Sequence, residues 1–376
     1  MLSASEINAY GHQLVLCPQC GGQGHFETLG AEPYMTAKSV CGQCDYASAD
    51  YYPSRENILR LIKEWSLGLR PSQIELPADG APVIVNYGAG VDSTAMLVHM
   101  VEQGIRPDLI LFADPGDEKP ETYIYIEFFD GWLQSKGFPG ITRVAYQPVR
   151  APYSTLEGNC LANETLPSIS FRKKSCTLKF KAGVMDAFLL GISRGPNKKP
   201  GWEPALNALA QGLKPVKLIG YDNGPLDSCR AVDIEEDKSF RYRYPLRQIK
   251  WSREDCILAI HKAGLPVPVK SACFHCASSK PWELYWMGAK HPDLLARALK
   301  IEDTARDGKH GLGNVQGLWG QKESWRQWCE QEAIIAPGTY TVIADPQALL
   351  QKARALMPPL ESNLDFKLPQ SIQEAA

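Results

Sequence analysis

A short glycine-bearing turn is the first segment of this 376-residue chain whose residue types suggest chemistry. It lies between an apolar run at 82–86 and a helical pattern from Ser93, and it consists of Gly88, Ala89, Gly90, Val91, Asp92, Ser93 and Thr94. Such a turn exposes backbone N–H groups at a helix N-terminus, which favours phosphate. No Lys follows the glycines, so the turn differs from the common P-loop. We expect it to bind the pyrophosphate of a nucleotide, with the Ser93 and Thr94 hydroxyls as further donors; the alternative is a tight connection without a ligand.

The cysteines near the N-terminus form a second chemical pattern. Cys17, Cys20, Cys41 and Cys44 follow the spacing C-x2-C-x20-C-x2-C. Glycines beside both pairs permit the tight turns that a metal site needs, and four thiolates at this spacing suit a structural Zn²⁺ ion. We therefore expect a zinc ribbon over residues 1–52. Modules of this kind contact nucleic acid or protein.

A further cysteine pair, Cys273 and Cys276, needs additional ligands if it holds a metal. Cys176 and Cys256 fall in elements expected to return to the same edge of a sheet, which makes a set of four thiolates possible. The alternatives are a redox pair, a zinc site that uses His275, and cysteines that are simply buried.

The elements that must position these residues alternate between short apolar runs and longer amphipathic stretches. Strands are predicted at 82–86, 109–113, 141–146 and 216–219, with a short extended piece at 242–246. Helices are predicted at 93–103, 121–135, 176–190 and 252–263. This alternation is typical of an α/β fold with a doubly wound, open parallel sheet. We place a linker helix in 53–80, the nucleotide-binding domain at 81–265, a helical C-terminal lid at 266–335 and a tail at 336–376.

Composition limits the classes of function. Hydrophobic residues make up 44% and charged residues 22%, and no apolar run approaches the roughly 20 residues of a membrane helix. The first residues lack the pattern of a signal peptide, so we expect a cytoplasmic protein without a membrane partner. The net charge of −2 argues against adhesion to nucleic acid through bulk charge.

Three segments carry a resemblance to a known family. Residues 88–94 resemble the S-G-G-x-D-S-T turn of the PP-loop ATP pyrophosphatases, with Gly88 in place of Ser and Ala89 in place of the first Gly. Residues 112–123 resemble the A-D-T-G-x-E-x-P-E-T-Y segment of the phosphoadenosine-phosphosulfate reductase-like proteins, and residues 172–179 resemble an R-x-C-T-x-x-x-K element of the same group. The likeness, to phage and bacterial members of the adenine nucleotide alpha hydrolase superfamily, departs at 220–230, where an acidic pair is rearranged.

The resemblance implies an enzyme that binds ATP and Mg²⁺. An acceptor oxygen would attack the α-phosphate, pyrophosphate would leave, and AMP would be transferred to the acceptor. Asp92 and Asp114 would help to hold Mg²⁺, and Arg172 and Lys179 would balance the charge of the transition state. Arg230 would contact the nucleotide.

The same resemblance implies sulfur transfer to, or a related modification of, DNA or RNA, with a sulfur-donor protein as partner. Iron–sulfur members of the family make a [4Fe–4S] cluster one interpretation of the set Cys176, Cys256, Cys273 and Cys276. One alternative is a sulfonucleotide reductase, although its C-terminal Cys signature is missing and only Cys329 lies late in the chain. Another is a non-catalytic, zinc-ribbon protein that binds nucleic acid.

Overall fold

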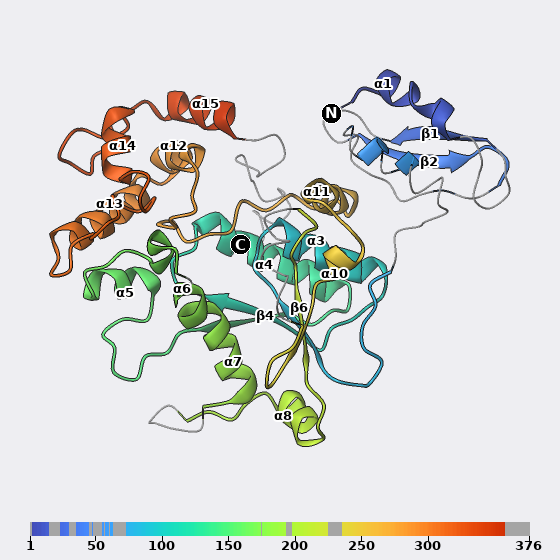
Figure 1. Cartoon of the computed structure of the whole chain (residues 1–376), viewed down its shortest axis with the longest axis horizontal. Helices are drawn as coiled ribbons and strands as arrows, with labels where there is room; N and C mark the ends of the chain where they lie inside the picture. The colour runs from blue at the N-terminus through green and yellow to red at the C-terminus, as the bar shows by residue number, and fades with distance from the viewer. Residues whose placement is uncertain are drawn as a thin grey trace.

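The computed structural model of the protein describes residues 2–14, 23–29, 35–44, 47, 55, 57–59, 61–62, 73–173, 175–192, 198–224 and 235–357. Within these ranges a small N-terminal module precedes a parallel sheet flanked by helices, and a group of C-terminal helices follows (Figure 1). In the same ranges every helix is too short or too polar to cross a membrane.

The N-terminal module contains two short helices and a hairpin. The helices are α1 (Ala4–Asn8) and η1 (Gly11–Gln13), and the antiparallel strands are β1 (Gly24–Leu29) and β2 (Thr36–Cys41). Ile58 and Leu61 are fully buried in the core of this module. They belong to the predicted linker helix, whose described residues at 55, 57–59 and 61–62 are helical. The start of that segment therefore packs as part of the module.

Five parallel strands form the central sheet. Their order across the sheet is β5 (Ile141–Ala145), β4 (Leu109–Asp114), β3 (Val83–Asn86), β6 (Val216–Ile219) and β7 (Arg241–Arg243). The strands predicted at 82–86, 109–113, 141–146 and 216–219 are confirmed. The extended piece predicted at 242–246 is correct only at its start, because Pro245 occupies the first position of α10 (Pro245–Gln248), where a proline ring favours helix.

Helices cover both faces of this sheet. On one face lie α3 (Val91–Glu102), α4 (Pro120–Ser135) and α11 (Arg253–Lys262). Phe129 of α4 joins the core that includes Val85 and Phe112 of the sheet. On the other face, Met185 of α7 (Gly183–Leu190) packs with Ile84. Mixed α/β architecture with a parallel sheet, as predicted, is confirmed.

The helix predicted at 176–190 consists of three pieces. They are α6 (Ser175–Thr177), the π-helical turn η3 (Leu178–Ala182) and α7. The connections around it contain helices that the sequence pattern did not predict: α5 (Leu156–Ala162), η2 (Ser168–Phe171) and α8 (Glu203–Ala210).

The C-terminal helices share a second core with α5 and η3. They are α12 (Pro281–Lys290), α13 (Pro292–Asp307), α14 (Trp325–Gln331) and α15 (Pro346–Leu356). Their buried side chains include Trp286, Leu295, Trp325 and Leu349. The predicted tail therefore contributes α15 to this unit, and the role of a lid stays a prediction.

Candidate functional site at the end of the central strands

The glycine-bearing turn lies where the strand order of the sheet reverses. The chain proceeds from β3 to β4 on one side, whereas β6 pairs with β3 on the other. In open α/β sheets, ligands bind beyond the carboxyl ends of the strands at this point. Gly220, which follows β6, approaches the first turn of α3 so closely that a Cβ there would lie 2.7 Å from Cα of Ser93. Only a glycine at 220 therefore lets β6 and the turn meet.

Hydroxyl groups brace the turn from inside. The Oγ of Ser93 accepts a hydrogen bond from the backbone N–H of Gly88 and donates one to the carbonyl of Gly90, both at 3.2 Å. The Oγ of Thr94 lies 3.2 Å from the hydroxyl of buried Tyr87. Ser93 is thus engaged with the backbone of the turn and Thr94 with a buried phenol, so the donors that favour an anion there are the backbone N–H groups at the N-terminus of α3.

Ala89 adopts the conformation that a glycine would take with less strain. Its φ is 54°, in the left-handed region, and its side chain is fully buried. The departure from the resembled motif at this position is therefore one of residue type and not of backbone shape.

Asp92 faces a cation from a distant segment. Its Oδ1 lies 2.7 Å from Nη1 of Arg253, the first residue of α11. Burial alone would lower the pKa of Arg253, but the charge of Asp92 raises it above its ordinary value. Arg253 was not predicted as a site residue, and it brings a fixed positive charge to the start of α3.

Two polar groups end the neighbouring strands. The Oδ1 of Asp114 at the end of β4 accepts hydrogen bonds from the N–H of Gly116 and the hydroxyl of Tyr123, both at 2.8 Å. Burial and this carboxylate raise the pKa of Tyr123, which keeps its proton. At the end of β3, the Oδ1 of Asn86 is buried and accepts no hydrogen bond from the described residues. Asn86 was also missed, although a polar residue that closes an apolar strand is a usable signal.

A chain of polar contacts leads away from the turn. A Cβ at Gly90 would lie 3.9 Å from Cβ of Ser271. The Oγ of Ser271 donates to buried Glu118 at 3.3 Å, and Nζ of Lys181 lies 3.3 Å from the other oxygen of that carboxylate. The charge of Glu118 raises the pKa of Lys181. None of these three residues was predicted, although residue 118 lies inside the segment 112–123 that carries the resemblance.

Three of the four cysteines in the predicted cluster line one cavity together with Ser271 and Lys181. The cavity has a volume of about 170 Å³, and Cys176, Cys273, Cys276 and Lys181 line it. Burial raises the pKa of Cys273 well above its ordinary value. Cys256 is not brought to this place: it is fully buried in the core between α11 and the sheet. Within the described ranges, no three His, Cys, Asp or Glu side chains stand close enough together to hold a metal ion. The residues as placed therefore do not fit a [4Fe–4S] cluster.

His275 holds the cysteine loop to the strand ends. Its Nε2 lies 3.1 Å from Oδ2 of Asp117, and both side chains are fully buried. The backbone N–H of Phe274 donates to the carbonyl of Asp117 at 2.9 Å. These contacts fix the 273–276 loop beside the loop that follows β4.

The two cations implied by the resemblance bond groups outside the turn. Nζ of Lys179 donates to the hydroxyl of Tyr153 at 2.8 Å and to Oδ1 of Asn159 at 3.1 Å. Arg172 has a φ of 58°, and its Nη2 donates to Oε1 of Gln321 at 3.4 Å. Arg230 lies outside the described residues.

The N-terminal cysteines are described only in part. Cys41 ends β2 and is buried, Cys44 is half-buried, and the N–H of Gln43 donates to Sγ of Cys41 at 3.3 Å. Cys17 and Cys20 lie outside the described residues, so the zinc ribbon stays a prediction.

A comparison with solved structures returns, among its matches, the crystal structure of phosphoadenylyl-sulfate (PAPS) reductase from Candida auris in a phosphate complex. The sequence identity is 15%, the match covers 71% of this chain and 90% of that chain, and the TM-score is 0.32. No family model and no curated protein matches the chain. The assignment of a function therefore rests on the geometry of the site.

Proposed function

We propose that the chain binds ATP on the turn at 87–94 and transfers AMP to an acceptor with release of pyrophosphate. The observation that carries this proposal is the position of the turn at the reversal of the strand order, closed against Gly220. Its backbone N–H groups and the N-terminus of α3 favour an anion there.

The reaction needs charge neutralisation as pyrophosphate leaves. The acceptor oxygen forms a bond to the α-phosphorus while the bond from that phosphorus to the bridging oxygen breaks, and pyrophosphate keeps the electron pair. Arg253 supplies a fixed positive charge next to the turn, and Lys181 supplies another along the chain of contacts from Ser271. The resemblance implies the same role for Arg172 and Lys179, whose hydrogen-bond partners lie outside the turn.

Mg²⁺ fits the donors at the turn. Magnesium prefers oxygen ligands. The orphaned Oδ1 of Asn86 and the carboxylate of Asp92 are such donors at either end of the turn, and Asp114 is a further candidate. When bound, the ion would neutralise the triphosphate. Zn²⁺ would have a structural role in the N-terminal module, where Cys17, Cys20, Cys41 and Cys44 would hold it. The backbone N–H of Gln43, which donates to the sulfur of Cys41, supports a thiolate at that position.

A specific observation also supports a second candidate, a sulfonucleotide reductase. Thiols of Cys176, Cys273 and Cys276 line a cavity that Ser271 connects to the turn, where a sulfonucleotide would present its sulfur. Cys329, the late cysteine that could have served as nucleophile, is fully buried among the C-terminal helices. In the ATP reaction, the same cavity would receive a sulfur supplied by a donor protein.

The test compares two glycine variants. Gly220→Ala places a methyl group against the backbone of Ser93, so ATP binding and pyrophosphate release should be lost. Gly131→Ala, in the exposed part of α4 where an added Cβ meets nothing within 4 Å, is the matched control and should retain both. Pyrophosphate release is measured from ATP with an acceptor mixture, and sulfite release from phosphoadenosine phosphosulfate is measured in parallel. Sulfite without pyrophosphate selects the reductase. Neither product, together with no nucleotide binding by the unmodified chain, refutes both enzymes and leaves a binding protein.

A further inference from the structure

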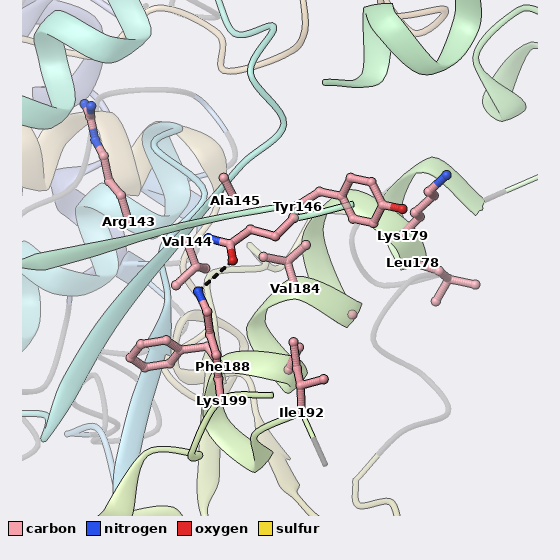
Figure 2. A pocket seen from close by; sticks show the side chains of 13 residues that line it. Arg143, Val144, Ala145, Tyr146, Leu178, Lys179, Val184, Phe188, Ile192 and Lys199 are labelled. Atoms are coloured by element: carbon pink, nitrogen blue, oxygen red, sulfur yellow. Dashed lines mark hydrogen bonds between the residues drawn. The ribbon is translucent and has the colours of Figure 1, made fainter. Parts of the chain in front are cut away.

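Three cavities adjoin one another from the edge of the sheet to the turn. The first, of about 500 Å³, lies between edge strand β5 and the helix pieces η3 and α7 (Figure 2). A second, of about 250 Å³, shares Lys179 with the first. The cysteine cavity shares Leu156, Cys176 and Phe180 with the second and ends at Ser271, beside Gly90. We call these three the cavity row.

The segment that builds most of the cavity row is basic. Residues 141–201 contain ten Lys or Arg residues and three Asp or Glu residues, in a chain whose net charge is −2. The seven surplus positive charges are thus concentrated on one part of an otherwise acidic chain. A local field of this kind attracts a polyanion even when the whole protein does not.

Two lysines in the outer part of the row have neutral hydrogen-bond acceptors, whereas Lys181 in the cysteine cavity pairs with Glu118. Nζ of Lys199 donates to Oε1 of Gln147 at 2.6 Å, and both residues line the first cavity (Figure 2). The acceptors of Lys179 are likewise a phenol and an amide oxygen. Arg143 has a carboxylate 3.7 Å away, that of Glu127, but both side chains are exposed to solvent, which screens the pair. The positive charge of the row therefore stays available to a ligand.

Aromatic side chains lie beside Lys179. The rings of Tyr146 and Tyr153 are stacked with centroids 6.4 Å apart, and the ammonium of Lys179 lies 5.0 Å and 4.5 Å from them. Both rings are half-buried, and the apolar side chain of Leu178 beside them is 64% exposed. Alternating cations and aromatic faces suit unstacked bases on a phosphate backbone better than they suit an acidic peptide, which has no flat groups to stack.

We propose that the cavity row binds a single-stranded nucleic acid. Its phosphates would lie along Arg143, Lys199 and Lys179, its bases would stack on Tyr146 and Tyr153, and one nucleotide would reach the cysteine cavity beside the turn. Naming this strand as the acceptor of AMP rests on the proposed function, whereas its binding does not.

The experiment measures binding of a fluorescent single-stranded oligothymidylate of twelve nucleotides to the full chain by anisotropy, over a range of salt concentrations. The double variant Arg143→Gln/Lys199→Gln should bind roughly 10-fold more weakly at low salt, and the slope of log K against log salt should fall by about 0.7 for each cation removed. The matched control is Arg354→Gln/Lys300→Gln, which removes the same charges from exposed sites on α15 and α13. Circular dichroism checks that all variants fold.

Equal weakening in both double variants would overturn the proposal, because bulk charge alone would then explain binding. So would the absence of binding, or tighter binding of polyglutamate that the row variant abolishes. Pyrophosphate release from ATP reports separately on the proposed function. If the protein binds the oligonucleotide through the row but does not bind ATP, the proposed enzyme is refuted and the docking surface is supported. If it releases pyrophosphate but does not bind the oligonucleotide, the docking surface is refuted and the proposed enzyme is supported.

Discussion

In the C-terminal helices, Nε of Arg326 lies 2.8 Å and 2.9 Å from the two carboxylate oxygens of Asp303, whereas Lys199 at the sheet edge bonds a neutral amide. The same contrast holds more widely. Arg306 and Lys352 also pair with carboxylates of the C-terminal unit. Charges in that unit neutralise one another and so contribute to its folding. Along the cavity row, Lys199 and Lys179 bond neutral groups, so their charges remain available to a ligand.

The largest effect should follow from removing the centre of the C-terminal network. Glu302 is fully buried and accepts hydrogen bonds from the backbone N–H groups of Leu318, Trp325 and Arg326 at 2.6 to 3.0 Å. Glu302→Ala leaves these donors unpaired, so we expect a loss of about 3–5 kcal/mol in the free energy of unfolding. Urea unfolding measures it, with exposed Asp307→Ala on the same helix as control. A loss as small as that of the control would show that this network does not stabilise the unit.

A paired substitution sharpens the comparison directly. Arg326→Gln removes one partner of a largely buried ion pair and should cost about 2 kcal/mol, whereas Lys199→Gln should change stability by less than about 0.5 kcal/mol. Oligonucleotide binding should respond in the opposite way, falling for Lys199→Gln and not for Arg326→Gln. Equal stability losses would erase the distinction between the two regions.

We expect the free energy of unfolding to fall at acidic pH. Burial alone would raise the pKa of Asp303, but hydrogen bonds from Arg326 and Tyr340 bring it below its ordinary value of 3.8. In the same way, Lys119 and Lys270 hold the pKa of buried Glu283 below 4.5. Both carboxylates therefore take up protons at a higher pH in the unfolded chain than in the folded protein. Their contribution to the free energy of unfolding is complete above about pH 4.5 and is lost as the pH falls through the folded pKa values. Unfolding at pH 7 and pH 3 tests this, and Arg326→Gln should flatten the dependence.

The smallest expected effect concerns Arg172. Its left-handed backbone costs a non-glycine residue about 1 kcal/mol, so Arg172→Gly should raise the melting temperature slightly. Oligonucleotide binding should stay unchanged, because Arg172 is not among the residues that line the three cavities. Ala333→Gly, at a φ of 52° in the C-terminal unit, should bring a similar gain with binding unchanged. If Arg172→Gly weakened oligonucleotide binding, the binding surface would extend beyond the cavity row to Arg172.

Local patterns predicted the elements of the sheet domain well. The apolar run at 83–86 and the helical spacing after Ser93 identify β3 and α3, and the turn between them is where the residue types indicated. Short helices were not predicted; the seven residues of α5, for example, span too few turns to show a helical periodicity.

Contacts across the fold were beyond the sequence pattern. The order of the strands decides which loops meet, and it brings Arg253 to Asp92 across 161 positions and Ser271 to Glu118 across 153. Cys256 follows the helical pattern of α11, whose apolar face is buried on α3, so its thiol is committed to that core and cannot join Cys273. Neither outcome could be read from spacing alone.

The two lysines of the π-helical turn η3 have different surroundings: Lys179 bonds Tyr153 where the first two cavities meet, and Lys181 pairs with Glu118 in the cysteine cavity. One residue corresponds to about 100° of rotation in an α-helix. Deleting a single residue from 178–182 would therefore restore a regular helix and swing α6 and Cys176 around the axis, away from Cys273. The extra residue in this one turn acts as a spacer, and a change of length there would alter the site more than most changes of side chain.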